Sequence, residues 1–270
     1  MAINDITLAG GMRGNLQSLQ LVDSLMSRTT ERLATGRKVN SAVDDPSAFF
    51  AAENHRSRAA DLSARKDAMS EAIQTIRAAS DGISGITKLI EQAKGLAASA
   101  RSATTADRAT LATQFDALRT QIDQLAGDAG YKGTNFLSSG SLTVEFNESG
   151  SSSITITGFD GSTTGLSISA AANSWAADAD IDAAVTELDA GLSTLRTNAA
   201  TLSSNNGVIS TRQDFTTSMI NNLTTGADKL TAADQNEEGA NMLALQTRQQ
   251  LGIVALSLTS QSQQSILRLF

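Results

Sequence analysis

The chain has 270 residues, and these include no Cys, one His and one Pro. This composition excludes disulfide frameworks, zinc sites built from Cys or paired His, and a Cys–His nucleophile pair, so a metal ion would need oxygen ligands. The formal net charge of −7 argues against a nucleic-acid partner, because neutralisation of phosphate charge supplies most of that affinity.

Only 4 % of the residues are aromatic and 18 % are charged, against a typical charged share of about 25 %. Ala, Leu, Ile, Ser and Thr must therefore do the packing, and the near absence of Pro favours long uninterrupted helices. Because the surfaces of such helices carry little charge, we expect them to be covered by partners.

The sequence at the two ends of the chain argues against membrane insertion. Residues 1–13 contain no basic leader followed by an apolar stretch, so we expect export without a cleavable signal peptide. The uncharged run between Arg248 and Arg268 is nearly as long as a membrane span, but it contains five Gln and four Ser residues. These are costly in hydrocarbon, so we expect no membrane insertion and burial against copies of a similar helix instead.

The first predicted helix ends near Gly36. Its apolar face recurs every seven residues, at Met12, Leu19, Met26 and Leu33, with Leu16 and Val22 beside it. The chain then breaks and restarts, with Asp45 placed to cap the next helix and Pro46 suited to its first position.

The second predicted helix runs from Pro46 to about Ala100, a length of roughly 80 Å. Its seven-residue repeat is Leu62, Met69, Ile76, Ile83, Ile90 and Ala97, with Ile73 on the adjoining seam. Thr104 and Asp107 then predict the N-terminal cap of a third helix. That helix ends near Gly127, and its apolar positions are Leu111, Phe115, Leu118, Ile122 and Leu125.

The period changes to two in the middle of the chain. Residues 142–146 and 154–157 predict two strands, joined as a hairpin by the Ser- and Gly-rich residues 148–152, and residues 166–168 suggest a third short strand. Helical spacing resumes at Ile181.

The fourth predicted helix carries a stripe that shifts by one position after residues 205–207. The stripe includes Leu188, Leu195, Leu202 and Ile209, and past residues 205–207 it is carried one position out of phase by Val208, Phe215 and Met219. A final helix begins near Asp234 and carries Leu243, Leu251, Val254, Leu258 and Ile266. The predicted fold is therefore mainly α, a folded-back coiled-coil bundle of long helices with a small central β-hairpin region.

No group of residues predicts catalysis, a metal site or a cofactor. Residues 178–182 with Asp189 resemble part of a calcium loop, but Ala183 stands where Gly makes the sharp turn, and an acidic first helical turn explains them better. His55 is expected to be a surface or packing residue. The central Ser and Thr residues suit either turns or glycan attachment; they are Ser151, Ser152, Ser153, Thr155, Thr157, Ser162, Thr163 and Thr164.

Several segments together closely resemble bacterial flagellin, in the form common among alphaproteobacteria. They are, in chain order, ERLATG (31–36), NSAVDDP (40–46), DGIS (81–84), GYKGTNFL (130–137), ADQNEEGANMLALQTRQQL (233–251) and the ending 266–270. The match spans nearly the whole chain except residues 145–175, and both ends match in order.

The resemblance implies the subunit of the flagellar filament, an extracellular structural protein for swimming motility and not an enzyme. It implies a homopolymer, with the flagellar type III export apparatus, an export chaperone, the filament cap and a junction protein as further partners. The hook–filament junction protein, a flagellin homologue, is the first alternative, and a secreted helical tip protein or adhesin is the second.

The resemblance also implies a division of the chain. Residues 1–40 and 230–270 would be paired terminal helices, the filament inner core, disordered in the monomer and ordered on assembly. Residues 41–128 and 176–229 would form the outer core, and residues 129–175 an exposed tip. The expected inner-core packing residues are Met12, Leu16, Leu19, Met26, Leu33, Leu243, Leu251, Val254 and Leu258.

Two further motifs follow from the family pattern. Asp44, Asp45 and Pro46 form the signature turn. A host innate immune receptor reads a Gln-Arg pair followed by a Leu in this family, and the matching positions here are Glu91, Gln92 and Leu96. Because the Arg charge is missing, activation of that receptor is not expected.

Overall fold

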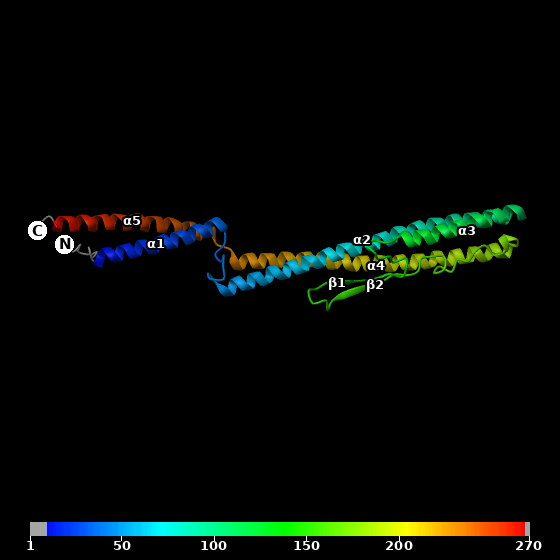
Figure 1. Cartoon of the computed structure of the whole chain (residues 1–270), viewed down its shortest axis with the longest axis horizontal. Helices are drawn as coiled ribbons and strands as arrows, with labels where there is room; N and C mark the ends of the chain where they lie inside the picture. The colour runs from blue at the N-terminus through cyan, green and yellow to red at the C-terminus, as the bar shows by residue number, and fades with distance from the viewer. Residues whose placement is uncertain (1–9, 268–270) are drawn as a thin grey trace, which may run out of the picture. The chain divides into compact units, whose positions relative to one another are not determined.

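A computed structural model describes residues 10–267 of the chain (Figure 1). It is mainly helical with one small antiparallel hairpin, which confirms the predicted fold class. The elements in chain order are α1 (Gly10–Thr35), α2 (Pro46–Ser102), α3 (Thr105–Asp128), β1 (Ser141–Glu145), β2 (Ser153–Thr157), the 3₁₀ helix η1 (Ala172–Trp175), α4 (Asp178–Thr231) and α5 (Gln235–Leu267).

The chain divides into two compact units, which we describe separately. The central unit is Ser57–Asn222, and the terminal unit combines the chain up to Arg56 with the chain from Leu223 onward. In the terminal unit α1 and α5 lie side by side (Figure 1). No helix in the described part of the chain is long and apolar enough to cross a lipid bilayer.

The core of the central unit is the predicted seven-residue seam. On α2, Leu62, Met69, Ile76, Ile83 and Ile90 are all buried. The facing residues of α4 also repeat every seven positions and are buried: Ile181, Leu188, Leu195, Leu202 and Ile209. Ion pairs from Lys94 to Asp189 and from Arg101 to Asp182 join α2 to α4 in antiparallel order. The long helices therefore fold back on each other, as predicted.

The predicted phase shift of the α4 stripe is wrong. The helix continues through residues 205–207 in one register, and the next buried position after Ile209 is Thr216, which is 2 % exposed. Val208 and Phe215 are 42 % and 57 % exposed. The polar Thr216 occupies the core position and the apolar Phe215 lies beside it, so the hydrophobicity pattern suggests a shift that the helix does not have.

The hairpin has the predicted strands. Leu142 pairs with Ile156 and Val144 with Ile154, so alternate side chains lie against the core, and the hydroxyls of Thr143 and Thr155 are 3.0 Å apart on the opposite face. Ion pairs of Arg65 with Glu145 and of Arg58 with Glu148 link the hairpin to α2.

Residues 129–175 were expected to be an exposed tip with a third strand at 166–168. Their large apolar side chains instead belong to the core, including Phe136, Leu137 and Trp175. Residues 163–167 form turns rather than a strand, because Leu166 N–H donates to Ser162 and Ile168 N–H to Thr163 within the loop. The exposed residues of the segment include Lys132, Thr143 and Thr155.

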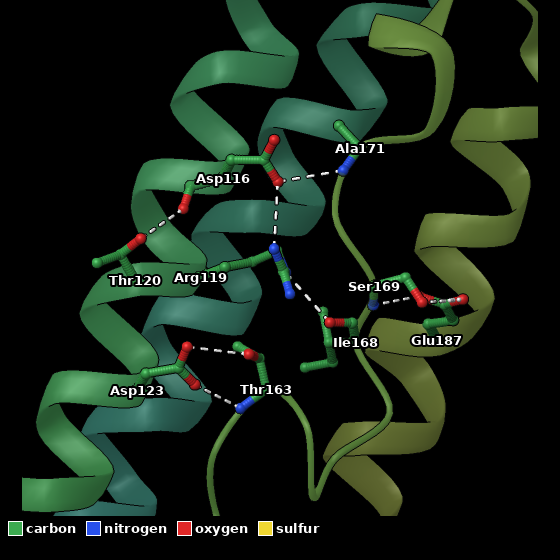
Figure 2. A network of polar contacts seen from close by, with 9 residues as sticks. All are labelled: Asp116, Arg119, Thr120, Asp123, Thr163, Ile168, Ser169, Ala171 and Glu187. Carbon is green, nitrogen blue, oxygen red and sulfur yellow. Dashed lines mark hydrogen bonds and ion pairs between the residues drawn. The ribbon is translucent and has the colours of Figure 1, made fainter.

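Carboxylates on the helices hold the loop between β2 and α4 (Figure 2). Asp123 of α3 accepts hydrogen bonds from the Thr163 amide at 2.7 Å and from its hydroxyl at 3.1 Å. Asp116 accepts from the Ala171 amide, and Glu187 of α4 accepts from the Ser169 amide at 2.7 Å. The loop therefore obtains from side chains the hydrogen bonds that a strand partner would supply.

The same network distinguishes the two roles expected for Thr163, which were turn formation and glycan attachment. Its hydroxyl is bonded to Asp123 and the residue is 2 % exposed, so it serves the loop and is not accessible to a glycan. Thr155, Thr157 and Thr164 are exposed, and for them the two expectations stay open.

Replacement of Asp123 by Ala should leave the buried Thr163 amide and hydroxyl without their acceptor. We expect a loss of about 1–3 kcal/mol in the free energy of unfolding of the central unit. The buried Trp175, the single Trp of the chain, provides the fluorescence signal. Asp67→Ala, at an exposed position of α2, is the matched control, and equal stability of the two variants would contradict this role of Asp123.

Candidate assembly surface on the terminal helices

The terminal unit contains an antiparallel pair of helices, α1 and α5. Met12, Leu19, Met26 and Leu33 of α1 are partly buried, as the seven-residue repeat predicts, whereas Leu16 is 42 % exposed. A Cβ atom on Gly252 of α5 would lie 2.8 Å from the Leu19 side chain. The absence of a side chain at Gly252 therefore allows α1 and α5 to approach closely.

A partly buried ion pair lies within this seam. The guanidinium Nη1 of Arg32 is 2.9 Å from Oε1 of Glu238, whose side chain is 8 % exposed. Removal of one partner from such a pair is costly, because the other charge stays buried. Arg32 and Glu238 therefore fix the relative register of α1 and α5.

The face of α5 that packs on α1 differs from the predicted one. Its residues follow steps of four and three and are Glu238, Met242, Leu245, Gln249, Gly252 and Leu256. Three of these six residues are charged, polar or Gly. A search for apolar residues at helical spacing therefore does not identify this face.

The predicted packing residues of α5 are exposed in the single chain. Leu243, Leu251, Val254 and Leu258 are 67 %, 64 %, 64 % and 68 % exposed. At about 100° per residue they fall within an arc of about 80°, opposite the face that contains Leu245 and Gly252. We call these four residues the outer stripe of α5. The helix is thus apolar on two opposite sides, and α1 covers one of them.

The turn after α1 is hydrogen-bonded to the segment that leads into α5. Gly36 adopts a positive φ of 68°, which ends α1 without strain. Backbone hydrogen bonds then connect Lys38 N–H to the Thr231 carbonyl at 2.7 Å and Ala233 N–H to the Gly36 carbonyl at 3.0 Å. Val39 is buried against this connection.

The signature turn has a direct physical explanation. Asp44 Oδ2 accepts hydrogen bonds from the amides of Asn40 and Ser41 and from the Ser41 hydroxyl, at 3.0–3.1 Å. These donors, the Ser41 amide first and then the Asn40 amide, hold the pKa of Asp44 below its ordinary value. Asp45 accepts from the Ala48 amide at 3.0 Å, and Pro46 is the first residue of α2, as predicted.

The acidic residues at the start of α4 do not converge. Asp178 pairs with Arg108, Asp182 with Arg101, and Asp180 lies within hydrogen-bond distance of the Ala177 amide. Within residues 10–267, no three acidic or His side chains are placed to hold a metal ion. Asp178 and Asp180 lie in the first turn of α4, where negative charge interacts favourably with the helix dipole.

The positions of the immune-receptor motif lie on α2 in the central unit. Glu91 and Gln92 are exposed, and Leu96 is partly buried against the core. The expected lack of receptor activation stays a prediction.

Long folded-back helices and an uncovered apolar helix face define the class of a helical, self-associating structural protein. Comparison with known proteins gives the family. Residues 3–141 match the bacterial flagellin N-terminal helical region, and residues 178–270 match the bacterial flagellin C-terminal helical region. The chain belongs to the bacterial flagellin family: it is an extracellular structural subunit of the flagellar filament, serves motility and is not an enzyme.

Full-length relatives agree with this family. Flagellin FljM of Caulobacter vibrioides is 32 % identical over the whole of both chains. A flagellin of Brucella melitensis is 29 % identical over 94 % of this chain and 95 % of its own. Both come from alphaproteobacteria, as the C-terminal signature predicted, and both are named flagellin rather than junction protein or adhesin. The crystal structure of Bacillus cereus flagellin is 18 % identical, with a TM-score of 0.47, over 54 % of this chain and 86 % of that one.

A pH titration tests the role of Asp44. Because its pKa is lowered in the folded turn, its hydrogen bonds stabilise the turn above its ordinary pKa of 3.8 and are lost as the pH falls through the folded value. We expect a value below 3.8 from NMR titration of the monomer. Ser41→Ala, which removes the hydroxyl donor, should move it back toward 3.8, and a wild-type value at or above 3.8 would contradict the account.

Proposed function

We propose that the pair formed by α1 and α5 is the filament inner core and that α2, α3 and α4 form the outer core. The observation that carries this proposal is the outer stripe of α5, which α1 leaves exposed. In a self-assembling flagellin, copies of the same chain are the partners available to cover it.

The energetics favour this assignment. Full burial of a Leu or Val side chain contributes about 1.5–3 kcal/mol, so covering the exposed two-thirds of each stripe residue contributes about 1–2 kcal/mol. Four such residues in every subunit supply a substantial driving force for association, although ordering of the ends opposes it.

The same reasoning supports terminal helices that order only on assembly. Between α1 and α5, the described residues that are buried are Thr29, Glu238 and Leu245, and the predicted seam residues of α1 are only partly buried. Such a small buried area does not offset the conformational entropy of two long helices. Contacts with neighbouring copies would complete it.

We further propose the partners that go with this role. The chain would pass unfolded through the type III export apparatus with the aid of an export chaperone. It would then meet the filament cap and, at the base of the filament, the junction protein. A chain without Cys suits passage in an unfolded state, because it forms no disulfide on the way.

Two charges in the outer stripe should stop assembly. Val254→Asp with Leu258→Asp places carboxylates where the neighbouring copy would bury apolar surface, so we expect no filaments at concentrations at which the wild type assembles. Removal of residues 243–270 should likewise leave a soluble helical monomer. Sedimentation and negative-stain microscopy after addition of filament seeds provide the measurement.

The matched control is Val254→Ile with Leu258→Met, which keeps the stripe apolar and nearly constant in volume. This control should assemble like the wild type. Normal filaments from the double-Asp variant would show that the outer stripe lies outside the assembly contacts.

A further inference from the structure

One flank of the α1–α5 pair contains a hollow of about 300 Å³ that is rich in arginine. Arg28 and Arg32 of α1 and Arg248 of α5 line it, together with Asn241 and Glu238. Glu238 is the single carboxylate among the lining residues, and it is already paired with Arg32 at 2.9 Å. Two exposed guanidinium groups, those of Arg28 and Arg248, therefore remain without a carboxylate in the hollow.

The chemistry of the hollow selects an anion. Guanidinium groups bind carboxylates through paired N–H donors, and Asn241 adds an amide donor beside them. The hollow is small and open to the side, so a single acidic side chain suits it better than a large cofactor.

The hollow adjoins the outer stripe of α5. Arg248 precedes Leu251 by three residues, and residues at this spacing are neighbours on a helix surface. A copy that covers the stripe therefore also covers the edge of the hollow. Two cations enclosed there without a counter-charge would oppose association, so the covering surface must supply an acid.

Among the described residues of the terminal unit, Asp23 is the carboxylate that fits this requirement. Glu53 and Asp228 approach Arg56, and Asp44, Asp45 and Asp234 accept backbone hydrogen bonds. Glu31 accepts a hydrogen bond from the Asn40 side-chain amide, so all of these carboxylates already have partners. Glu237 lies three helical turns before Arg248 on the same side of α5, on the flank of the hollow itself. Asp23 is exposed on α1 and is rotated by about 140° from Arg28, so it faces another side.

We propose that the hollow lined by Arg28, Arg32 and Arg248 receives the Asp23 carboxylate of a second copy of this chain. Cations on one flank and an acid on another give a head-to-tail contact, which repeats indefinitely instead of closing into a dimer. This inference rests on the proposed inner-core role and adds a specific polar contact to it.

Charge reversal tests the contact. Arg28→Glu with Arg248→Glu should raise the critical concentration for seeded polymerisation by at least about tenfold, and Asp23→Arg should do the same, because each opposes like charges across the contact. The single variant Arg13→Glu, at an exposed position of α1 outside the hollow, controls for an arginine-to-glutamate replacement elsewhere on the terminal pair and should assemble normally.

A mixture of the two defective proteins gives the decisive result. In the mixture, the Glu-lined hollow of the first variant can bind the Arg at position 23 of the second. The Arg-lined hollow of the second variant can bind Asp23 of the first. An equimolar mixture should therefore polymerise near the wild-type critical concentration. Circular dichroism checks that each variant keeps its helices. The neutral variant Arg28→Gln with Arg248→Gln provides a second route, and it should also raise the critical concentration.

The outcomes separate this inference from the proposed function. Wild-type protein that fails to polymerise on seeds would refute the proposed function. If the wild type assembles and both hollow variants also assemble normally, the Asp23 contact alone is overturned. A mixture that stays as defective as its components would overturn it as well. A defect of the hollow variants that appears only in sulfate would assign the hollow to an inorganic anion and would also overturn the contact.

Discussion

The structure depends on the way in which α5 is packed: α1 covers one side of it, and the opposite apolar side is left uncovered. Gly252 and the partly buried Arg32–Glu238 pair set the position of α1 on the first side. The outer stripe occupies the other side and is about two-thirds exposed in the single chain. Burial of the second apolar side would stabilise such a helix further, so we propose that copies of the same chain complete the terminal unit.

The central unit has no such requirement. Its seam of Leu and Ile side chains is closed within one chain, from Leu62 to Ile90 on α2 and from Ile181 to Ile209 on α4. The few large aromatic side chains come mainly from elsewhere: Phe115 from α3, and Phe136 and Trp175 from the segment between α3 and α4. The rings of Phe115 and Trp175 are 5.0 Å apart. A low aromatic content thus suffices, because the core is thin and long.

The helices could be predicted from the sequence because local signals agreed with the seven-residue repeat. Thr104 accepts a hydrogen bond from the Asp107 amide, Asp45 caps α2, and Gly36 ends α1. Each does so as its residue type suggests. Errors arose where tertiary packing overrode residue type. Thr216 occupies a core position while Phe215 is exposed, and residues 166–168 alternate like a strand but form a turn fastened by carboxylates on α3 and α4.

The assembly surface could be predicted only in part, for a related reason. The outer stripe was found because its residues are apolar, but the face that packs on α1 includes Glu238, Gln249 and Gly252, which no hydrophobicity pattern selects. The arginine hollow depends on side chains from two helices more than 200 residues apart in sequence, so spacing along the chain could not reveal it.

Hydroxyl-radical footprinting of the outer stripe, in monomer and in assembled filament, tests the central claim most directly. Side-chain oxidation at Leu243, Leu251, Val254 and Leu258 should be strong in the monomer and strongly reduced in the filament, because neighbouring copies cover the stripe. Equal oxidation of these four residues in both states would contradict the claim that assembly completes the terminal unit.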